Sequence, residues 1–166
     1  MTIRLLLIFL LSDVFLMAHE ISLDSTLDVS PKGQLKHTFK RDDLKNIVID
    51  LNLKYMWQDN IDAKQIRKGL NDAKDYCHKL TLGNFIDWRL PTIEELETII
   101  DHSNLTSVVN SQFKNVKSDY YISASPLLSD IDTISYMDFS QGIKYDGNRK
   151  GKAYVRCVRG KQEYKF

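Results

Sequence analysis

The stretch DWRLPTIEEL at residues 87–96 decides the fold of this chain, because it specifies where a helix begins. Pro91 fixes the backbone ahead of the helix, and Thr92 with Glu95 forms a capping box, in which two side chains satisfy otherwise unpaired backbone N–H groups. We therefore predict a helix that starts at Thr92 and ends by residues 101–104. Its buried side carries Ile93, Leu96, Ile99 and Ile100.

The other residues of this stretch also have a structural interpretation. We interpret Trp88 and Leu90 as core anchors, and we expect Arg89 to bind backbone carbonyls or a carboxylate. A second motif, Trp57-Gln58-Asp59, receives the same interpretation. Both motifs are expected to specify the fold rather than to carry chemistry.

The clearest helical period precedes this stretch. Apolar residues recur at spacings of three and four, which is the pattern of one buried helix face. They are Ala63, Ile66, Leu70, Ala73, Cys77 and Leu80. Asp62 is placed to cap this helix, and Gly83-Asn84 ends it. Since Cys77 belongs to the apolar stripe, its sulfur is expected to face the core.

Short β-branched and aromatic runs predict strands on both sides of these helices. A hairpin is expected from residues 47–49 and 53–57, with its turn at residues 50–52. The C-terminal half adds four strands, at residues 120–123, 134–139, 142–145 and 153–158. Asp146-Gly147-Asn148 predicts a hairpin turn, because Gly and Asn accept positive φ. Together these elements predict a single α+β domain.

The first residues predict export from a bacterial cell. Arg4 provides a positive charge, Leu5–Leu11 is an unbroken apolar run, and Val14–Ala18 extends it beyond the interruption at Asp13. An apolar stretch of about 7–15 residues that ends at a small residue is typical of a secretory signal, whereas a membrane span needs about 20 apolar residues. We predict cleavage after Ala18 and no stable membrane span in the mature protein; a buried N-terminal helix is the alternative.

The expected organisation follows from this cleavage. It comprises a signal peptide at residues 1–18, a linker or N-terminal arm at 19–38, one domain at 39–160 and a C-terminal tail at 161–166. The product is expected in the periplasm, at the cell surface or outside the cell.

The two cysteines are predicted to form a structural disulfide. An even number of cysteines in an exported chain favours pairing. In the last strand Val155 and Cys157 share one face, which we take as buried because the other face carries Arg156. A Cys77–Cys157 bond closes a loop of about 80 residues, which is worth about 4–5 kcal/mol in the chain-entropy model. A reactive thiol next to His78 is the alternative.

Composition and charge fit one globular domain with a basic C-terminal segment. The 166 residues are 43% hydrophobic and 27% charged, and the net charge of +1 provides no overall attraction to nucleic acid. Residues 141–166 alone carry +6. The basic residues that flank the predicted hairpin tip are candidate contacts for an anionic ligand: Lys144, Arg149, Lys150 and Lys152. A generic basic surface is the alternative.

Eight segments, in order, resemble the C-terminal domain of the Legionella collagen-like adhesin, a bacterial family mostly of unknown function. They are residues 39–42, 47–50, 56–60, 73–77, 87–96, 121–125, 137–142 and 154–159. The resemblance implies a C-type-lectin-like fold, with two helices packed on short antiparallel strands and a disulfide from the first helix to the last strand. Tyr121 and Tyr136 stand where the family usually has tryptophan, and Asn52-Leu53-Lys54 replaces a commoner Thr-Gly-Leu turn.

The resemblance and the charge pattern favour a non-enzymatic, extracytoplasmic binding domain. The resemblance implies a glycan partner, because the collagen-like adhesin is thought to bind sulfated glycans; acidic or sulfated glycans or a surface protein are the expected partners. Arg89-Leu90-Pro91-Thr92 also resembles the formylglycine-generating enzyme superfamily, but that activity needs copper-binding cysteines, and both cysteines here are committed to the disulfide. An enzyme, or an envelope structural component without a ligand, is the alternative.

Other chemistries have weaker support in the sequence. Four aspartates offer oxygen ligands for calcium, but their spacing is not that of an EF-hand and favours a solvated acidic loop: Asp119, Asp130, Asp132 and Asp138. Nucleic acid is not expected, because only Tyr145 and Tyr154 lie near the basic residues for stacking. We expect no catalytic residues, no metal and no cofactor.

Overall fold

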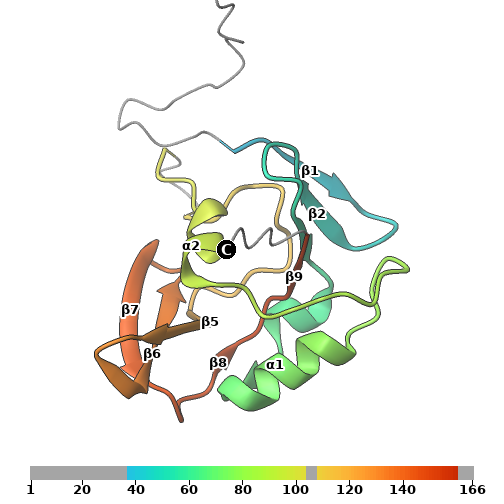
Figure 1. The fold of residues 1–166 in the computed structure, drawn as a ribbon. Helices are drawn as coiled ribbons and strands as arrows, with labels where there is room; N and C mark the ends of the chain where they lie inside the picture. The colour runs from blue at the N-terminus through green and yellow to red at the C-terminus, as the bar shows by residue number, and fades with distance from the viewer. Residues whose placement is uncertain (1–36, 104–107, 161–166) are drawn as a thin grey trace, which may run out of the picture. The chain divides into compact units, whose positions relative to one another are not determined.

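A computed structural model describes residues 37–103 and 108–160 (Figure 1). These residues form nine strands, two α-helices and one 3₁₀ helix, which confirms the predicted α+β class. The predicted signal peptide, its cleavage after Ala18, the linker up to residue 36 and the tail at 161–166 lie outside the described residues. Within the described residues no helix is long and apolar enough to span a membrane.

The first sheet joins the beginning and the end of the domain. Its order is β1-β2-β3-β9, and every neighbouring pair is antiparallel. The strands are β1 (Phe39–Asp42), β2 (Ile47–Asp50), β3 (Met56–Gln58) and β9 (Val158–Arg159). The predicted hairpin at residues 47–57 is confirmed. Its turn is fixed by the buried Asp50, whose Oδ1 accepts the N–H groups of Asn52 and Leu53 at 2.8 and 2.9 Å.

The second sheet holds five strands in the order β4-β8-β5-β6-β7. They are β4 (Arg67–Lys68), β8 (Ala153–Tyr154), β5 (Tyr120–Leu127), β6 (Asp130–Asp138) and β7 (Ile143–Asn148). All pairs are antiparallel except β5 with β8. The strands predicted at residues 120–123, 134–139 and 142–145 are confirmed, and each of the corresponding strands extends beyond its predicted range.

The hairpin turn predicted at Asp146-Gly147-Asn148 is wrong. These residues continue β7 and pair with Ser135, Ile134 and Thr133 of β6. They gain ladder hydrogen bonds along β6, and neither Gly147 nor Asn148 adopts a positive φ. The glycine that turns the chain between β6 and β7 is Gly142, with a φ of 72° and an N–H that donates to the Asp138 carbonyl at 2.7 Å.

The first α-helix is shorter than its apolar period predicts. Helix α1 covers Leu70–Lys79 and begins at Gly69, so the predicted start and the Asp62 cap are wrong. Residues 61–64 form the 3₁₀ helix η1 (Ile61–Lys64), and β4 pairs with β8. Strand pairing overrides the helical period there, because the Ile66 carbonyl accepts the Val155 N–H at 3.0 Å. Gly83 and Asn84 do turn the chain after the helix, with φ of 61° and 67°.

The second helix begins where its capping box predicts but ends at Thr98, before the predicted end at residues 101–104, and Ile100 instead forms a β-bridge with Val109. Helix α2 covers Ile93–Thr98, with Thr92 Oγ1 accepting the Glu95 N–H at 3.3 Å and Glu95 Oε2 accepting the Thr92 N–H at 2.9 Å. Arg89 donates to both carboxylate oxygens of Glu95, at 2.7 and 2.6 Å, so a carboxylate is its partner here, one of the two alternatives left open by the sequence. Glu95 therefore fixes the start of α2 through Thr92 and the segment before the helix through Arg89.

Two apolar clusters lie against the two helices. The first cluster includes the buried stripe of α1 and the buried Trp88: Leu70, Ala73, Cys77, Trp88, Ile122 and Val155 belong to it. The second includes the buried side of α2 and the fully buried Trp57: Trp57, Ile93, Leu96, Ile99, Tyr121 and Met137 belong to it. Both tryptophan motifs therefore act as core anchors, as expected.

The predicted disulfide is present between Cys77 and Cys157, with a Cα–Cα distance of 5.5 Å. Arg156, which was expected to mark the exposed face of the last strand, is fully buried. The strand predicted at residues 153–158 is split into β8 and β9, which belong to different sheets. Cys157 lies in the buried segment that crosses between the two sheets.

Removing the disulfide should destabilise the domain strongly. We expect the Cys77→Ala/Cys157→Ala double variant to lose about 4–5 kcal/mol of unfolding free energy, because the unfolded chain regains the freedom of a loop of about 80 residues. Urea unfolding measures this loss, and the reduced wild-type protein is the matched control. An oxidised wild type that unfolds at the same urea concentration as the double variant contradicts the prediction.

Glu95 should make stability depend on acid pH. Burial opposes its ionisation, but hydrogen bonds from Arg89 and the Thr92 backbone outweigh burial and lower the pKa of Glu95. Its contribution is therefore complete above the unfolded pKa of about 4.3 and is lost as the pH falls through the lower folded pKa. We expect Glu95→Gln to cost about 1–3 kcal/mol at pH 7 and to flatten the acid decline. Unfolding across this range, with the exposed neighbour variant Glu94→Gln as control, checks it; equal acid slopes for both variants refute it.

Candidate functional site

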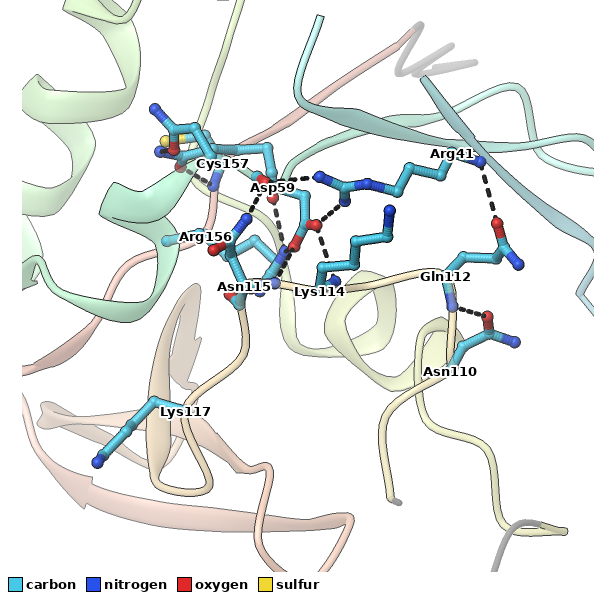
Figure 2. A network of polar contacts seen from close by, with 12 residues as sticks. Arg41, Asp59, Asn110, Gln112, Lys114, Asn115, Lys117, Arg156 and Cys157 are labelled. Atoms are coloured by element: carbon cyan, nitrogen blue, oxygen red, sulfur yellow. Dashed lines mark hydrogen bonds and ion pairs between the residues drawn. The ribbon is translucent and has the colours of Figure 1, made fainter. Parts of the chain in front are cut away.

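A buried polar network joins the Trp57-Gln58-Asp59 motif to the segment between β8 and β9 (Figure 2). The fully buried Asp59 carboxylate accepts hydrogen bonds from Arg41 Nη1 and, at 2.8 Å, from Arg156 Nη1. It also accepts the backbone N–H groups of Lys114 at 2.9 Å and Asn115 at 3.2 Å. Charge-assisted bonds of this kind are strong, so Asp59 acts as a structural anchor.

Arg156, the partner of Asp59, was predicted to lie on the exposed face of the last strand but is buried. Its two Nη atoms also donate to the Gln58 and Asn115 carbonyls, each at 2.6 Å. Its guanidinium lies 5.0 Å from the centre of the Phe113 ring, within cation–π range. Arg156 therefore holds β3 to the loop at residues 110–117. Its side chain is buried and does not belong to a surface site.

Gln58 joins the same region to helix α1 and the disulfide. Its Oε1 accepts the Cys157 N–H at 3.0 Å, and its Nε2 donates to the Tyr76 hydroxyl at 2.9 Å. Burial raises the pKa of Tyr76 to about 12, against the lowering effect of the Gln58 bond, so the hydroxyl stays protonated. Gln58 therefore links β3 to α1 and to the backbone of Cys157.

The basic candidates divide between two places on the second sheet. Arg149, Lys150 and Lys152 lie in the turn at residues 149–152, which we call the basic turn. Lys144 lies five residues earlier on β7, roughly 16 Å along the strand, and pairs with Asp146 at 3.6 Å. The structure therefore brings three of the four predicted residues together and leaves Lys144 apart.

Backbone bonds hold the basic turn in one shape. The Arg149 N–H donates to the Asp132 carbonyl at 2.7 Å, and the Gly151 N–H donates to the Asn148 carbonyl at 2.9 Å. The Lys150 N–H donates to Asn148 Oδ1 at 2.8 Å. The three basic side chains are exposed, and in the described part of the chain none of them pairs with a carboxylate. Their charge is available to a ligand.

A pocket of about 210 Å³ lies beside this turn, and the sequence analysis did not predict it. We call it the tyrosine pocket, because Tyr120, Tyr136 and Tyr145 line it together with Gly147, Gly151, Arg67 and Lys152. Tyr145 and Tyr120 are 53% and 40% exposed, whereas Tyr136 is 5% exposed. The three rings come from three strands, so no local sequence pattern could have found the pocket.

Two glycines allow the backbone to approach the tyrosine rings. A Cβ atom on Gly147 would lie 2.8 Å from Tyr145 Cε1, and one on Gly151 would lie 3.0 Å from the Tyr136 hydroxyl. That hydroxyl donates to the Asn148 carbonyl at 2.7 Å. Burial raises the pKa of Tyr136, and the neighbouring Tyr145 adds to the rise, so the donor keeps its proton.

Arg67 and Lys152 make the rim of the tyrosine pocket positive. Arg67 Nη2 donates to the Lys152 carbonyl at 3.0 Å, and its guanidinium lies 5.3 Å from the Tyr154 ring centre. The lining includes no aspartate or glutamate. Arg149 and Lys150 line a second hollow of about 350 Å³ at the start of α1, together with Asp72.

The acidic residues considered for calcium use their oxygens locally. Asp130 accepts the Asp132 N–H at 2.9 Å and the Thr133 hydroxyl at 2.7 Å, and Asp138 accepts the Ser140 N–H at 2.7 Å. Over residues 37–103 and 108–160, no group of three or more metal-binding side chains is close enough to hold an ion.

Comparison with protein families gives a match to most of the domain. The family model described as the Lcl C-terminal domain matches residues 46–159, which is more than half of the chain. The matched range includes both cysteines, the basic turn and the whole lining of the tyrosine pocket. No curated protein matches the sequence.

Neutralising Asp59 should destabilise the fold by about 3–5 kcal/mol, because Arg156 would be left buried without a counter-charge. Urea unfolding of Asp59→Asn measures the loss. The matched control is Asp43→Asn. It also removes a carboxylate that pairs with Arg41, but the Asp43 side chain is 65% exposed. Equal effects of the two variants would show that the buried network is not a structural anchor.

Proposed function

The chain belongs to the Lcl C-terminal domain family, as its ordered motifs predicted, and on this premise we propose that it is a non-enzymatic adhesion-type domain that binds acidic or sulfated glycans. The observation that carries the proposal is the basic turn. Three exposed cations project from one rigid turn and, among the described residues, have no carboxylate partner. Such a surface attracts polyanions over the Debye length of the solution.

The domain acts outside the cytoplasm in this proposal. The buried disulfide fits an oxidising compartment, and in the described part of the chain no cysteine is free. Residues 1–18 act as the signal peptide, and the mature protein begins at His19. The two helices, the two sheets and the helix-to-terminus disulfide also agree with a C-type-lectin-like fold, which we include in the proposal.

A surface protein is the second candidate partner, and one observation favours it. The hairpin between β5 and β6 exposes two large apolar side chains, Leu128 at 98% and Ile131 at 79%. Exposed apolar groups of this size are typical of protein contacts when they form a patch. The glycan is preferred, because the unpaired cations of the basic turn lie beside a pocket lined by exposed tyrosines.

Charge reversal in the basic turn should weaken glycan binding. We expect Arg149→Glu/Lys150→Glu to lower the affinity for heparin, a sulfated glycan, by about tenfold or more, because two attractions become repulsions. Wild-type binding should fall between about 0.1 M and about 1 M salt, where the Debye length shrinks from about 10 to about 3 Å. Calorimetry or surface plasmon resonance measures both effects.

The matched control carries the same change of net charge elsewhere. Lys40 and Lys117 are exposed, and Figure 2 shows Lys117 pointing away from the buried network. Lys40→Glu/Lys117→Glu should keep heparin affinity close to that of the wild type. An equal loss in both double variants, or binding that does not respond to salt, contradicts the proposed site.

A further inference from the structure

We infer that the tyrosine pocket is the selective part of this site: it takes one sugar ring that bears an acidic group, with the ring stacked on Tyr145 and Tyr120 and the acid facing Arg67 and Lys152. The inference rests on the proposed function and adds a property to it. The basic turn attracts any polyanion, whereas the pocket would distinguish a carbohydrate from a polyanion without sugar rings.

The exposed tyrosine rings are arranged to receive a flat ligand. Tyr120 and Tyr145 have ring centres 5.4 Å apart and ring planes tilted by 51°, so they form two walls of a corner. About half of Tyr145 is exposed although it lies in a strand. The ring face carries partial negative charge, which complements the weakly positive C–H groups on the apolar face of a sugar.

The size of the pocket matches a single ring. Its volume of about 210 Å³ is below the range of about 300–1,000 Å³ that is usual for sites of drug-sized ligands. An extended glycan would therefore place one sugar in the pocket and continue outside it. The basic turn contributes Gly151 and Lys152 to the pocket and Arg149 and Lys150 to the second hollow, so neighbouring acidic sugars would pass over its cations.

The charges on the rim select an acidic substituent. Arg67 uses one nitrogen on the Lys152 carbonyl, which orients the guanidinium and leaves its other donors for a ligand. Arginine forms two parallel bonds with carboxylate or sulfate oxygens, and Lys152 adds a second positive charge. The lining contains no carboxylate that would compete with an acidic ligand for these donors.

The floor of the pocket is rigid before any ligand binds. Tyr136 is almost fully buried and is fixed by its bond to the Asn148 carbonyl, and the backbone of Gly147 packs against the rings of Tyr136 and Tyr145. A preformed pocket loses little conformational entropy on binding, so a weak stacking contact still adds to affinity.

Two polyanions separate stacking from charge. The affinities of the full-length mature protein for heparin and for inorganic polyphosphate are measured with wild type and with Tyr145→Ala. We expect Tyr145→Ala to lower heparin affinity by about fivefold or more and to leave polyphosphate affinity within about twofold. Tyr145→Phe should bind heparin like the wild type, because it keeps the ring. Arg149→Glu/Lys150→Glu should weaken binding of both polyanions.

The control variant is Ile143→Ala. Ile143 lies two residues from Tyr145 on β7, is also 53% exposed and does not line the pocket, so its removal should leave both affinities unchanged. Thermal unfolding checks that each variant is folded, and Tyr120→Ala provides a second test of the same corner.

The outcomes separate a failure of the tyrosine-pocket inference from a failure of the proposed glycan binding. Equal losses for heparin and polyphosphate in Tyr145→Ala, or no loss for either, overturn the inference and leave the proposed function in place. A wild type that binds no heparin overturns both. If sedimentation shows self-association of the wild type that Tyr145→Ala abolishes while heparin binding persists, the tyrosines form a protein contact and the inference is wrong.

Discussion

The structure depends on how the terminal segment crosses from one sheet to the other. β8 ends at Tyr154 and β9 begins at Val158, and the residues between them are buried. Arg156 is bound there to the Asp59 carboxylate, and Cys157 is bonded to Cys77 of α1. Without Asp59 the side chain of Arg156 would be a buried, unpaired positive charge. The buried segment between β8 and β9 is therefore stable only when the Arg156–Asp59 ion pair is formed. This segment therefore fixes the two sheets relative to each other and to α1.

The same crossing determines where the candidate site lies. β8 starts one residue after Lys152, so the position of β8 between β4 and β5 also fixes the basic turn. The turn is bonded on its other side to β6 through the Asp132 carbonyl. Arg67 comes to the same place because β4 pairs with β8. A buried structural network and an exposed polar surface thus share one stretch of chain, with inward-facing groups stabilising it and outward-facing groups available for binding.

Local signals in the sequence predicted those parts of the fold that local physics determines. The Thr92–Glu95 capping box and the inward-facing Cys77 follow from contacts within a few residues or from one helix face. The start of α1, the extension of β7 through Asn148 and the burial of Arg156 depend on strand pairing and on Asp59, almost a hundred residues away from Arg156. The basic residues were candidates because of their charge, although the hairpin tip expected between them is wrong. The tyrosine pocket was not predicted, because it is assembled from three strands.

The most direct test of the account is to map a short heparin oligosaccharide onto the isotopically labelled mature protein by NMR chemical-shift perturbation. The account predicts that the largest shifts fall on the backbone of the basic turn and on Tyr145, with the Arg89–Glu95 region unchanged. Shifts concentrated on α2 or on the β5–β6 hairpin, with the basic turn silent, would contradict it.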